Sequence, residues 1–363
     1  MLTLVPTALT ISAAPQPQVE VVARGLRVPW AIAFASDGRA FVTERPGRVR
    51  VLAHGVLEPR PYFVVPGVAA EGEGGLLGIA LHPEFPRRPF LYLYYTSRFG
   101  RLGGSMQNRV IRLEDRAGRA GPWQVIVDGI PGFNYHNGGR IAFGPDGRLY
   151  IGTGYADIPA LARRLDSLAG KILRVNDDGS IPDDNPFPGS PIYSYGHRNV
   201  QGLAWHPFTK RLYATEHGPT GEGGLCCRDE LNLIVPGKDY GWPAVSGVVG
   251  DPRFVDPLLT SGPTETWAPS GLAFAAPEGT RSLTLFFAAL RGRHLHQVLL
   301  DDEGVRVVSE GKLLPWEFGR LRDVVAGPDG WLYLLTSNRD GRGIPTAGDD
   351  RVLRVRVPIP PTH

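Results

Sequence analysis

A short pattern recurs six times along this 363-residue chain. Two copies hold Gly-x-Ala-Phe or Gly-x-Ala-Trp outright and the others hold looser variants of it; a Pro or an Asp-Gly pair follows, and then an apolar pair that is often Leu-Tyr. The six copies lie at residues 30–43, 77–94, 139–152, 201–214, 270–286 and 321–334. Recurrence of this kind indicates a repeat fold, in which one structural unit is written several times.

The repeated unit has the character of β-strands rather than helices. Two apolar runs rich in Val, Ile, Leu and Tyr flank a tight turn, and Asp-Gly supplies the positive backbone torsions that such a turn needs. A further run closes most units, as at 47–52, 171–175 and 351–355, which makes three or four strands per unit. One small sheet cannot bury both of its faces, whereas six arranged radially can. The repeats therefore predict an all-β fold, a six-bladed β-propeller of four-stranded antiparallel blades.

We expect a single propeller domain over residues 18–358. Repeat folds grow by adding units, so this length requires no second domain, and no linker interrupts the repeats. An N-terminal tail at 1–17 and a C-terminal tail at 359–363 would flank the propeller. The 47 glycines and 34 prolines suit a protein of turns and long loops, and only 160–168 has a helical pattern.

Composition argues against two classes of partner. The formal net charge is +3 and the basic residues are scattered, so nucleic acid is not an expected ligand. No run of eighteen apolar residues follows residue 17, so no membrane span is expected. Residues 1–14 are mildly apolar and end in two alanines, like a trimmed secretion signal, which favours a periplasmic or secreted protein. Arginine greatly outnumbers lysine, which fits a heat-stable protein or a GC-rich genome equally well.

The two cysteines are adjacent, at Cys226 and Cys227. In a secreted protein an adjacent pair can close a vicinal disulfide. The alternative is two small residues in a loop, and the sequence leaves both open.

Polar clusters that interrupt the repeats are the candidates for function, because the strands of a propeller are occupied with packing. The clusters lie at 71–75, 134–140, 195–199 and 215–219, and the last continues at 228–230 and 240–243. We expect them just before or after the innermost strand of a blade. Corresponding positions in radial repeats converge on one axis, so the clusters predict one shared site.

The side chains in these clusters suggest specific chemistry. His136 could take up a proton near neutral pH, although a turn histidine bonded to a local carbonyl is the alternative. Arg198 and Asn199 offer a planar donor fork and an amide, or else an ordinary loop ion pair. Glu216, Asp229 and Glu230, with nearby main-chain carbonyls, carry the hard oxygen atoms that calcium prefers, or else belong to a solvated acidic loop.

Taken together, the motifs resemble those of the soluble quinoprotein glucose and aldose sugar dehydrogenases. These are six-bladed propellers that use pyrroloquinoline quinone (PQQ) and calcium. The resemblance extends from about residue 28 to residue 355. Seven motifs carry it in order: Glu-Gly-Gly-Leu-Leu-Gly-Ile-Ala-Leu-His-Pro at 73–83, His-Asn-Gly-Gly-Arg at 136–140, Gly-His-Arg-Asn-Val-Gln-Gly-Leu-Ala-Trp at 196–205, Glu-His-Gly-Pro at 216–219, Asp-Glu-Leu-Asn-Leu-Ile at 229–234, Tyr-Gly-Trp-Pro at 240–243 and Arg-Leu-Arg-Asp at 320–323.

This resemblance implies an enzyme that oxidises aldose sugars at C1 to lactones. It implies that His136 is the general base for the anomeric hydroxyl, while hydride passes to the quinone. Arg198 and Asn199 would lie beside the quinone carbonyls, where a cation and a donor stabilise the reduced cofactor. Arg320 and Arg322 would face the cofactor carboxylates.

The resemblance also implies two calcium sites. The carbonyls of Gly218 and Pro219 would hold an ion that acts as a Lewis acid on the quinone. Glu230 and the Tyr240 carbonyl would hold a second, structural ion. The expected partners are a small aldose and an external electron acceptor. The chain lacks long insertions between blades, which favours a monomer with an open site over the dimeric glucose enzyme.

Three positions depart from the family pattern. Glu73 stands where the family more often has glutamine, and we expect it beside the substrate rather than in a structural ion pair, because no lysine or arginine adjoins it in sequence. The cofactor-contacting lysine of the family appears here as Arg291. The segment 221–227 is additional.

The sequence leaves two other functions open. A calcium-dependent lactonase would need several acidic and asparagine side chains converging on the axis as direct metal ligands. A non-catalytic propeller that binds carbohydrate or protein would keep the fold without needing the base at His136.

Overall fold

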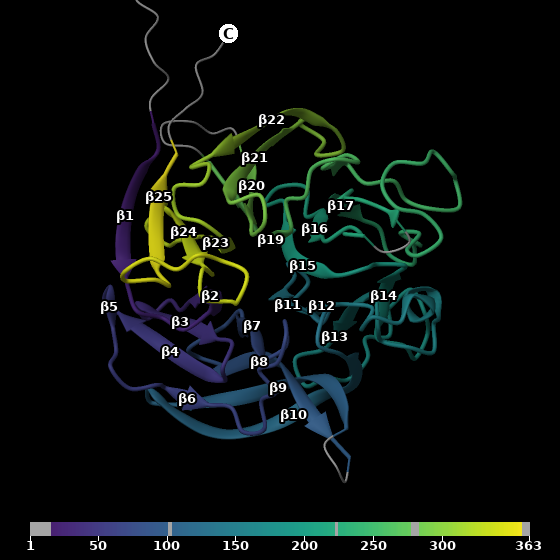
Figure 1. Cartoon of the computed structure of the whole chain (residues 1–363). Coiled ribbons are helices and arrows are strands. Elements are labelled where there is room, and N and C mark those ends of the chain that lie inside the picture. The colour runs from purple at the N-terminus through teal and green to yellow at the C-terminus, as the bar shows by residue number, and fades with distance from the viewer. Residues whose placement is uncertain (1–15, 101–103, 222–223, 277–282, 358–363) are drawn as a thin grey trace, which may run out of the picture.

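The computed structural model describes residues 16–100, 104–221, 224–276 and 283–357. Over these residues six antiparallel sheets surround a central axis, as Figure 1 shows, which confirms the predicted six-bladed β-propeller. The described strands run from Gln18 to Arg356. Residues 1–15 and 358–363 lie outside the described residues, and they include most of the predicted N-terminal tail and all of the C-terminal one.

Each blade is ordered from the axis outward, and blades one to six follow the chain. The innermost strands are β2 (Pro29–Phe34), β7 (Leu76–Leu81), β11 (Gly138–Phe143), β15 (Val200–Trp205), β19 (Pro269–Ala275) and β23 (Leu321–Ala326). The second strands are β3 (Arg39–Glu44), β8 (Phe90–Phe99), β12 (Leu149–Thr153), β16 (Leu212–Glu216), β20 (Thr284–Ala289) and β24 (Leu332–Thr336).

The two outer layers complete the blades. The third strands are β4 (Arg48–Ala53), β9 (Ser105–Arg116), β13 (Lys171–Val175), β17 (Glu230–Ile234), β21 (His294–Leu300) and β25 (Val352–Arg356). The outermost are β5 (Val56–Leu57), β10 (Arg119–Gly132), β14 (Ile192–Tyr195), β18 (Leu259–Thr260), β22 (Val307–Leu313) and β1 (Gln18–Ala23). In blade one, β6 (Phe63–Val64) also pairs with β4. A short 3-10 helix, η1 (Pro159–Arg163), overlaps the segment with the helical pattern.

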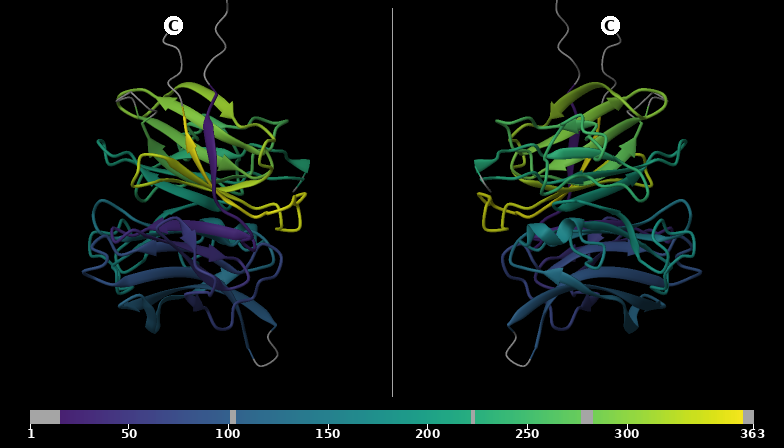
Figure 2. Two further views of the ribbon diagram at one scale, coloured as in Figure 1. Left: turned by 90° about the vertical axis from the view of Figure 1, so that its left-hand side faces the viewer. Right: turned by 90° about the vertical axis from the view of Figure 1, so that its right-hand side faces the viewer.

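The last blade is built from both ends of the described chain. β1 pairs with β25 in antiparallel register, from Gln18 opposite Arg356 to Ala23 opposite Val352. Figure 2 shows β1, in purple, lying among the yellow and green strands of the C-terminal half. This pairing closes the ring of blades.

The glycine of the repeat is required by close packing around the axis. A Cβ atom on Gly78 would lie 2.2 Å from the Gly139 carbonyl oxygen of the next blade. One on Gly202 would lie 2.3 Å from the Ser270 carbonyl oxygen. Real Cβ atoms do not approach backbone this closely, so only glycine lets neighbouring innermost strands come together.

All six innermost strands share a second feature. Each shows a register shift against its second strand within its first four residues. A β-bulge bends a strand and re-aims the side chains beside it, and bulges concentrate at rims next to functional sites. The six shifts lie at the same mouth of the central channel.

One predicted placement was wrong in detail. The cluster at 215–219 follows the second strand β16, not an innermost strand. Because β16 runs antiparallel to β15, Glu216 lies opposite Val200, at the end where β15 begins. The cluster therefore still lies at the same mouth as the others.

Two further observations bear on the sequence analysis. Cys226 and Cys227 are joined by a disulfide. In the described part of the chain, no helix has the length and apolar character that a membrane span requires.

The packing around the axis gives a first test. Replacing Gly202 by alanine should lower the free energy of unfolding by about 1–3 kcal/mol or more, because the added methyl overpacks the contact between blades four and five. Gly311→Ala is the matched control, since nothing lies within 4 Å of a Cβ built on Gly311. Chemical denaturation of both variants measures the difference, and equal stabilities would contradict the packing argument.

Candidate active site

The bulged mouth of the channel contains a cavity of about 570 Å³. Every blade contributes to its wall through residues at or near the start of its innermost strand. Seven of the predicted site residues line it: Glu73, His136, Arg198, Gly218, Arg291, Arg320 and Arg322. Four do not, namely Asn199, Pro219, Glu230 and Tyr240.

His136 is held from several directions. It adopts a positive φ of 57°, and its main-chain N–H donates to Glu73 Oε2 at 3.1 Å. Its ring stacks on the Tyr155 ring with centroids 4.8 Å apart. Nε2 lies 3.1 Å from Arg198 Nη2, and Nδ1 lies 3.5 Å from Asp157 Oδ1.

These neighbours define the protonation state of the His136 ring. A guanidinium group only donates hydrogen bonds, so the nitrogen that faces Arg198 must present a lone pair. The ring proton of the neutral imidazole then lies on Nδ1, facing the Asp157 carboxylate. Nε2 is consequently the atom of this histidine that can accept a proton.

Asp157 is a site residue that the sequence analysis missed. It follows β12, the second strand of blade three, and its Oδ1 accepts a hydrogen bond from the Tyr155 hydroxyl at 3.2 Å. The sequence does show Asp157 as a polar residue shortly after the second strand of its blade. The cluster at 215–219 lies at the corresponding place in blade four.

Arg198 is clamped between aromatic rings. Its guanidinium carbon lies 5.4 Å from the ring centroids of both Tyr155 and Trp242. Nη1 donates to the His217 carbonyl at 2.9 Å, and the main-chain N–H of Arg198 donates to Glu216 Oε2 at 3.1 Å. Aromatic faces attract a cation, so this arrangement fixes a positive charge beside His136.

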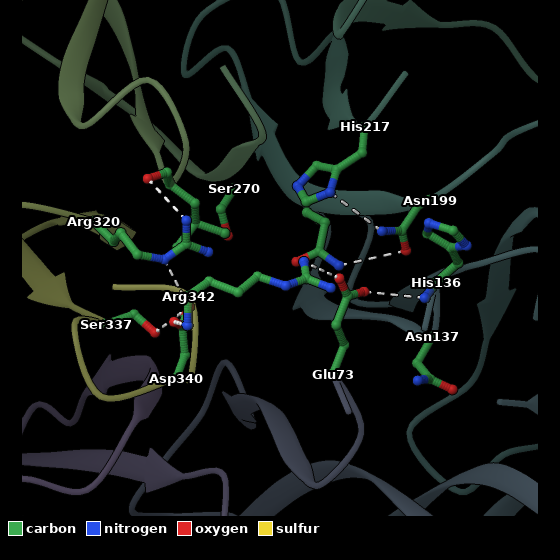
Figure 3. Close-up of polar contacts among 12 residues, drawn as sticks. Glu73, His136, Asn137, Asn199, His217, Ser270, Arg320, Ser337, Asp340 and Arg342 are labelled. Carbon is green, nitrogen blue, oxygen red and sulfur yellow. Dashed lines mark hydrogen bonds and ion pairs between the residues drawn. The ribbon is translucent and has the colours of Figure 1, made fainter. Parts of the chain in front are cut away.

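Asn199 lies behind the cavity wall in this structure. Its side chain is fully buried behind the cavity wall, where Oδ1 accepts from the Gly138 N–H at 2.9 Å and lies 3.4 Å from Gln201 Nε2. Figure 3 shows the nitrogen of this amide directed at His217. The residue therefore positions the main chain that follows His136.

Two predicted arginines differ in how well they are neutralised. Arg320 Nε donates to Asp340 Oδ2 at 2.8 Å. Arg322 forms no ion pair with any described residue; its Nη1 donates to Gln201 Oε1 at 2.7 Å, and its buried Nε has no hydrogen-bond partner among them. Burial lowers the pKa of Arg322 to about 9. Arg291 reaches the cavity from its exposed edge.

Glu73 lines the cavity, but the expectation that it makes no ion pair was wrong. Its Oε1 accepts from Arg342 Nη1 at 2.6 Å, across 269 positions of sequence. Figure 3 shows the two side chains meeting in front of His136. Burial alone would raise the pKa of Glu73, but the charge of Arg342, the nearby rings of His136 and His217 and the hydrogen bond from the His136 N–H lower it to about 2, so the carboxyl group is ionised.

The Gly218–Pro219 turn is braced by a buried carboxylate. Asp229 Oδ1 accepts from the Gly218 N–H at 2.9 Å, while its Oδ2 accepts from the Trp267 and Ala268 N–H groups at 2.6 and 2.9 Å. The Gly218 carbonyl accepts no hydrogen bond from the described residues, and the Pro219 carbonyl adjoins the antiparallel bridge between Thr220 and Cys226. Gly218 also packs against the disulfide loop, because a Cβ there would lie 2.0 Å from the Cys227 carbonyl oxygen.

Glu230 and Tyr240 lie beside a separate void of about 10 Å³, which Glu216 and Gly218 also line. Asn232 Nδ2 donates at 3.1 Å to both Glu216 and Glu230. Burial and repulsion from Glu216 raise the pKa of Glu230. Over the described ranges, no three or more His, Cys, Asp or Glu side chains are grouped to hold a metal ion. A cation here would need main-chain oxygens as well.

This arrangement of His136, the cavity arginines and the carbonyls of Gly218 and Pro219 can be compared with known proteins. The family model for glucose/sorbosone dehydrogenases matches residues 26–346. The chain belongs to this family.

Relatives cover most of the chain. Aldose sugar dehydrogenase YliI of Escherichia coli K12 is 34% identical over 348 residues, covering 89% of this chain and 91% of that protein. Quinoprotein glucose dehydrogenase B of Acinetobacter calcoaceticus is 34% identical over 262 residues, covering 64% and 53%. The PQQ-bound structure of an aldose sugar dehydrogenase from Streptomyces coelicolor superposes with a TM-score of 0.82 at 41% identity, covering 95% and 99%. These findings confirm the predicted resemblance to the quinoprotein sugar dehydrogenases.

In this sugar dehydrogenase family member, a buried lysine supports the loop beside the base. Lys171 is fully buried, and its Nζ donates to the carbonyls of Leu161, Ala162 and Ala169 at 2.9, 2.8 and 2.6 Å. Three donors thus meet three acceptors. The sequence did not reveal this role, because a lysine inside a strand usually points to solvent.

Replacing Lys171 by methionine should leave these three carbonyls without their donor. We expect the free energy of unfolding to fall by at least about 3 kcal/mol, at roughly 1–3 kcal/mol for each unsatisfied buried group. Lys210→Met is the matched control, because exposed Lys210 bonds a single carbonyl, that of Pro207. Thermal and denaturant unfolding provide the measurement. A Lys171 variant as stable as the control would show that the lysine does not hold this loop.

Proposed function

We propose that this protein is a PQQ- and calcium-dependent enzyme that oxidises aldose sugars at C1 to lactones. The observation that carries the proposal is His136 Nε2, a proton acceptor held beside Arg198 in an arginine-lined cavity. Electrons would pass on to an external acceptor. A periplasmic or secreted location is proposed from the N-terminal composition.

The charge of the cavity wall fits an anionic cofactor. Seven arginines line it, at positions 45, 198, 291, 293, 320, 322 and 342, against three acidic residues. Those acidic residues are already engaged: Glu73 with Arg342, Asp340 with Arg320, and Asp229 with main-chain N–H groups. The bare Nε of buried Arg322 lacks an acceptor among the described residues. A quinone that carries carboxylates would supply acceptors of the right charge and planar geometry.

The main-chain carbonyl oxygens of Gly218 and Pro219 are suitable ligands for calcium. Carbonyl oxygens are hard ligands, and calcium accepts main-chain carbonyls together with cofactor oxygens. We propose that these two carbonyls hold the ion beside the quinone. Glu230 and the Tyr240 carbonyl are proposed as ligands of a second, structural ion in the smaller void.

The reaction can be assigned to the residues of the site. His136 Nε2 takes the proton of the C1 hydroxyl, and Asp157 holds the ring in the required tautomer and stabilises the imidazolium that forms. PQQ, when bound with calcium, supplies the two-electron acceptor for the C1 hydride. Loss of that hydride and proton converts the C1–O single bond into the lactone carbonyl. Arg198 keeps a positive charge where negative charge develops.

The alternative functions find less support. A lactonase would use several acidic side chains as direct metal ligands, and the described residues place no such group at the axis. A purely binding propeller would not need a histidine with a proton-accepting nitrogen in the cavity wall. Both alternatives predict that addition of PQQ and calcium produces no sugar-dependent reduction of a dye.

The role of His136 can be tested by substitution. His136→Ala should fold and bind PQQ, seen by its absorbance, while sugar-dependent dye reduction falls about 10²–10⁴-fold, the usual cost of losing a general base. His54→Ala, at an exposed position in blade one, is the control. Retention of more than about a tenth of the wild-type turnover would remove His136 from the proton-transfer step.

The calcium proposal has its own test. Exhaustive chelation should abolish activity of the PQQ-loaded enzyme, and calcium should restore it, because hard carbonyl oxygens favour this ion. Elemental analysis must accompany the assay. Full activity in protein shown to contain no metal would contradict a role for calcium.

A further inference from the structure

Arg342 is a cavity residue that no sequence motif singles out. It lies on the loop between β24 and β25, and its side chain is 54% exposed where that of its partner Glu73 is 20% exposed. Its guanidinium lies 5.6 Å from the Tyr135 ring centroid. The side chain therefore spans from blade six to the loops that precede β7 and β11 (Figure 3).

The contact continues to the base. Glu73 uses Oε1 for Arg342 and Oε2 for the main-chain N–H of His136, so one carboxylate joins the two residues. His136 has a positive φ, which a non-glycine residue adopts only when its surroundings hold it there. The bond from Glu73 is one of the interactions that hold it.

The other end of the contact leads toward Arg320. Asp340 Oδ1 accepts from the Arg342 N–H at 2.9 Å, and Asp340 Oδ2 accepts from Arg320 Nε at 2.8 Å. A single turn thus orders both a proposed cofactor-facing arginine and the arginine that pairs with Glu73.

We propose that Arg342 is a positioning residue for the general base, acting through Glu73, and that their ion pair forms the blade-six side of the opening over the sugar site. This inference rests on the proposed function for its catalytic consequence. The claim that Arg342 holds His136 in place through Glu73 does not depend on that function.

The electrostatic consequence follows from the groups that face Glu73. Besides Arg342, these are His136, His217, Arg45 and Arg322, each from a different element. Without Arg342, Glu73 would keep its burial but lose its strongest compensating charge, so its pKa would rise. An unpaired carboxylate would then face both the base and an anionic cofactor.

The experiment compares Arg342→Gln, Glu73→Gln and the double variant with the wild type. The matched control is Arg98→Gln. Arg98 pairs with Glu71, which lies two positions before Glu73 on the same loop, and this pair is outside the cavity. We expect Arg342→Gln to lower kcat/KM at pH 8 by about tenfold or more, mainly through kcat. Its activity relative to the wild type should recover as the pH falls and Glu73 is protonated. The double variant, whose two amides can bond each other, should show a ratio that does not change with pH and a smaller loss.

A second readout needs neither cofactor nor substrate. Hydrogen exchange at the His136 amide in the free protein should be faster in Arg342→Gln by at least about threefold, because its acceptor is less ordered, and unchanged in Arg98→Gln. Unchanged exchange together with a pH-independent ratio would overturn the proposal. An equal loss at every pH that the double variant does not relieve would also overturn it, as a purely structural effect. A wild type with no PQQ-dependent activity would instead refute the proposed function, and the exchange measurement would still decide the role of Arg342.

Discussion

Closure of the ring by β1 and β25 is the constraint on which the rest of the structure depends. The six blades bury one another only as a complete circle, and the pairing of chain segments more than 320 positions apart completes it. The closure extends past the strands, because Leu26 and Asp350 exchange two main-chain hydrogen bonds of 3.1 Å, and the Val28 N–H donates to Asp350 Oδ2. These bonds anchor the end of the loop that carries Arg342, and so fix where blade six meets Glu73.

Repetition explains why the fold was predictable. The blades repeat similar turns and the same apolar alternation, and several repeat the glycine, so one interpretation applied six times reinforces itself. Gly78 and Gly202 illustrate this, because the repeated glycine marks the points where neighbouring innermost strands approach too closely for a Cβ atom. The convergence of the polar clusters followed from the same symmetry.

The parts of the site that sequence could not supply are those that break the repeat. The pair between Arg342 and Glu73 joins residues on different blades, and Arg342 lies outside the polar clusters that adjoin the innermost strands. In the sequence Lys171 looks like an ordinary solvent-facing lysine of a strand. Only the structure shows that the loop whose carbonyls it bonds folds over it. Motifs also indicate proximity better than direction: Asn199 lies next to Arg198 in its motif, yet its amide turns into the wall while the guanidinium turns to the cavity.

The site gathers positive charge that the protein leaves uncompensated. Radial convergence brings arginines from several blades to one mouth, and the acidic residues there are already engaged in bracing loops. The low pKa of Arg322 expresses the resulting cost, since burial disfavours its charged form. A folded-state pKa below the ordinary 12.5 means that the unfolded chain binds more protons between about pH 9 and pH 12.5. The charge on Arg322 therefore destabilises the free protein at neutral pH, and this cost diminishes only as the pH rises above 9. An anionic ligand that binds the folded state alone would relieve this cost and stabilise the fold by mass action. The positive charge of Arg322, unpaired among the described residues, thus lies in the cavity, where an anionic ligand would supply the missing partner.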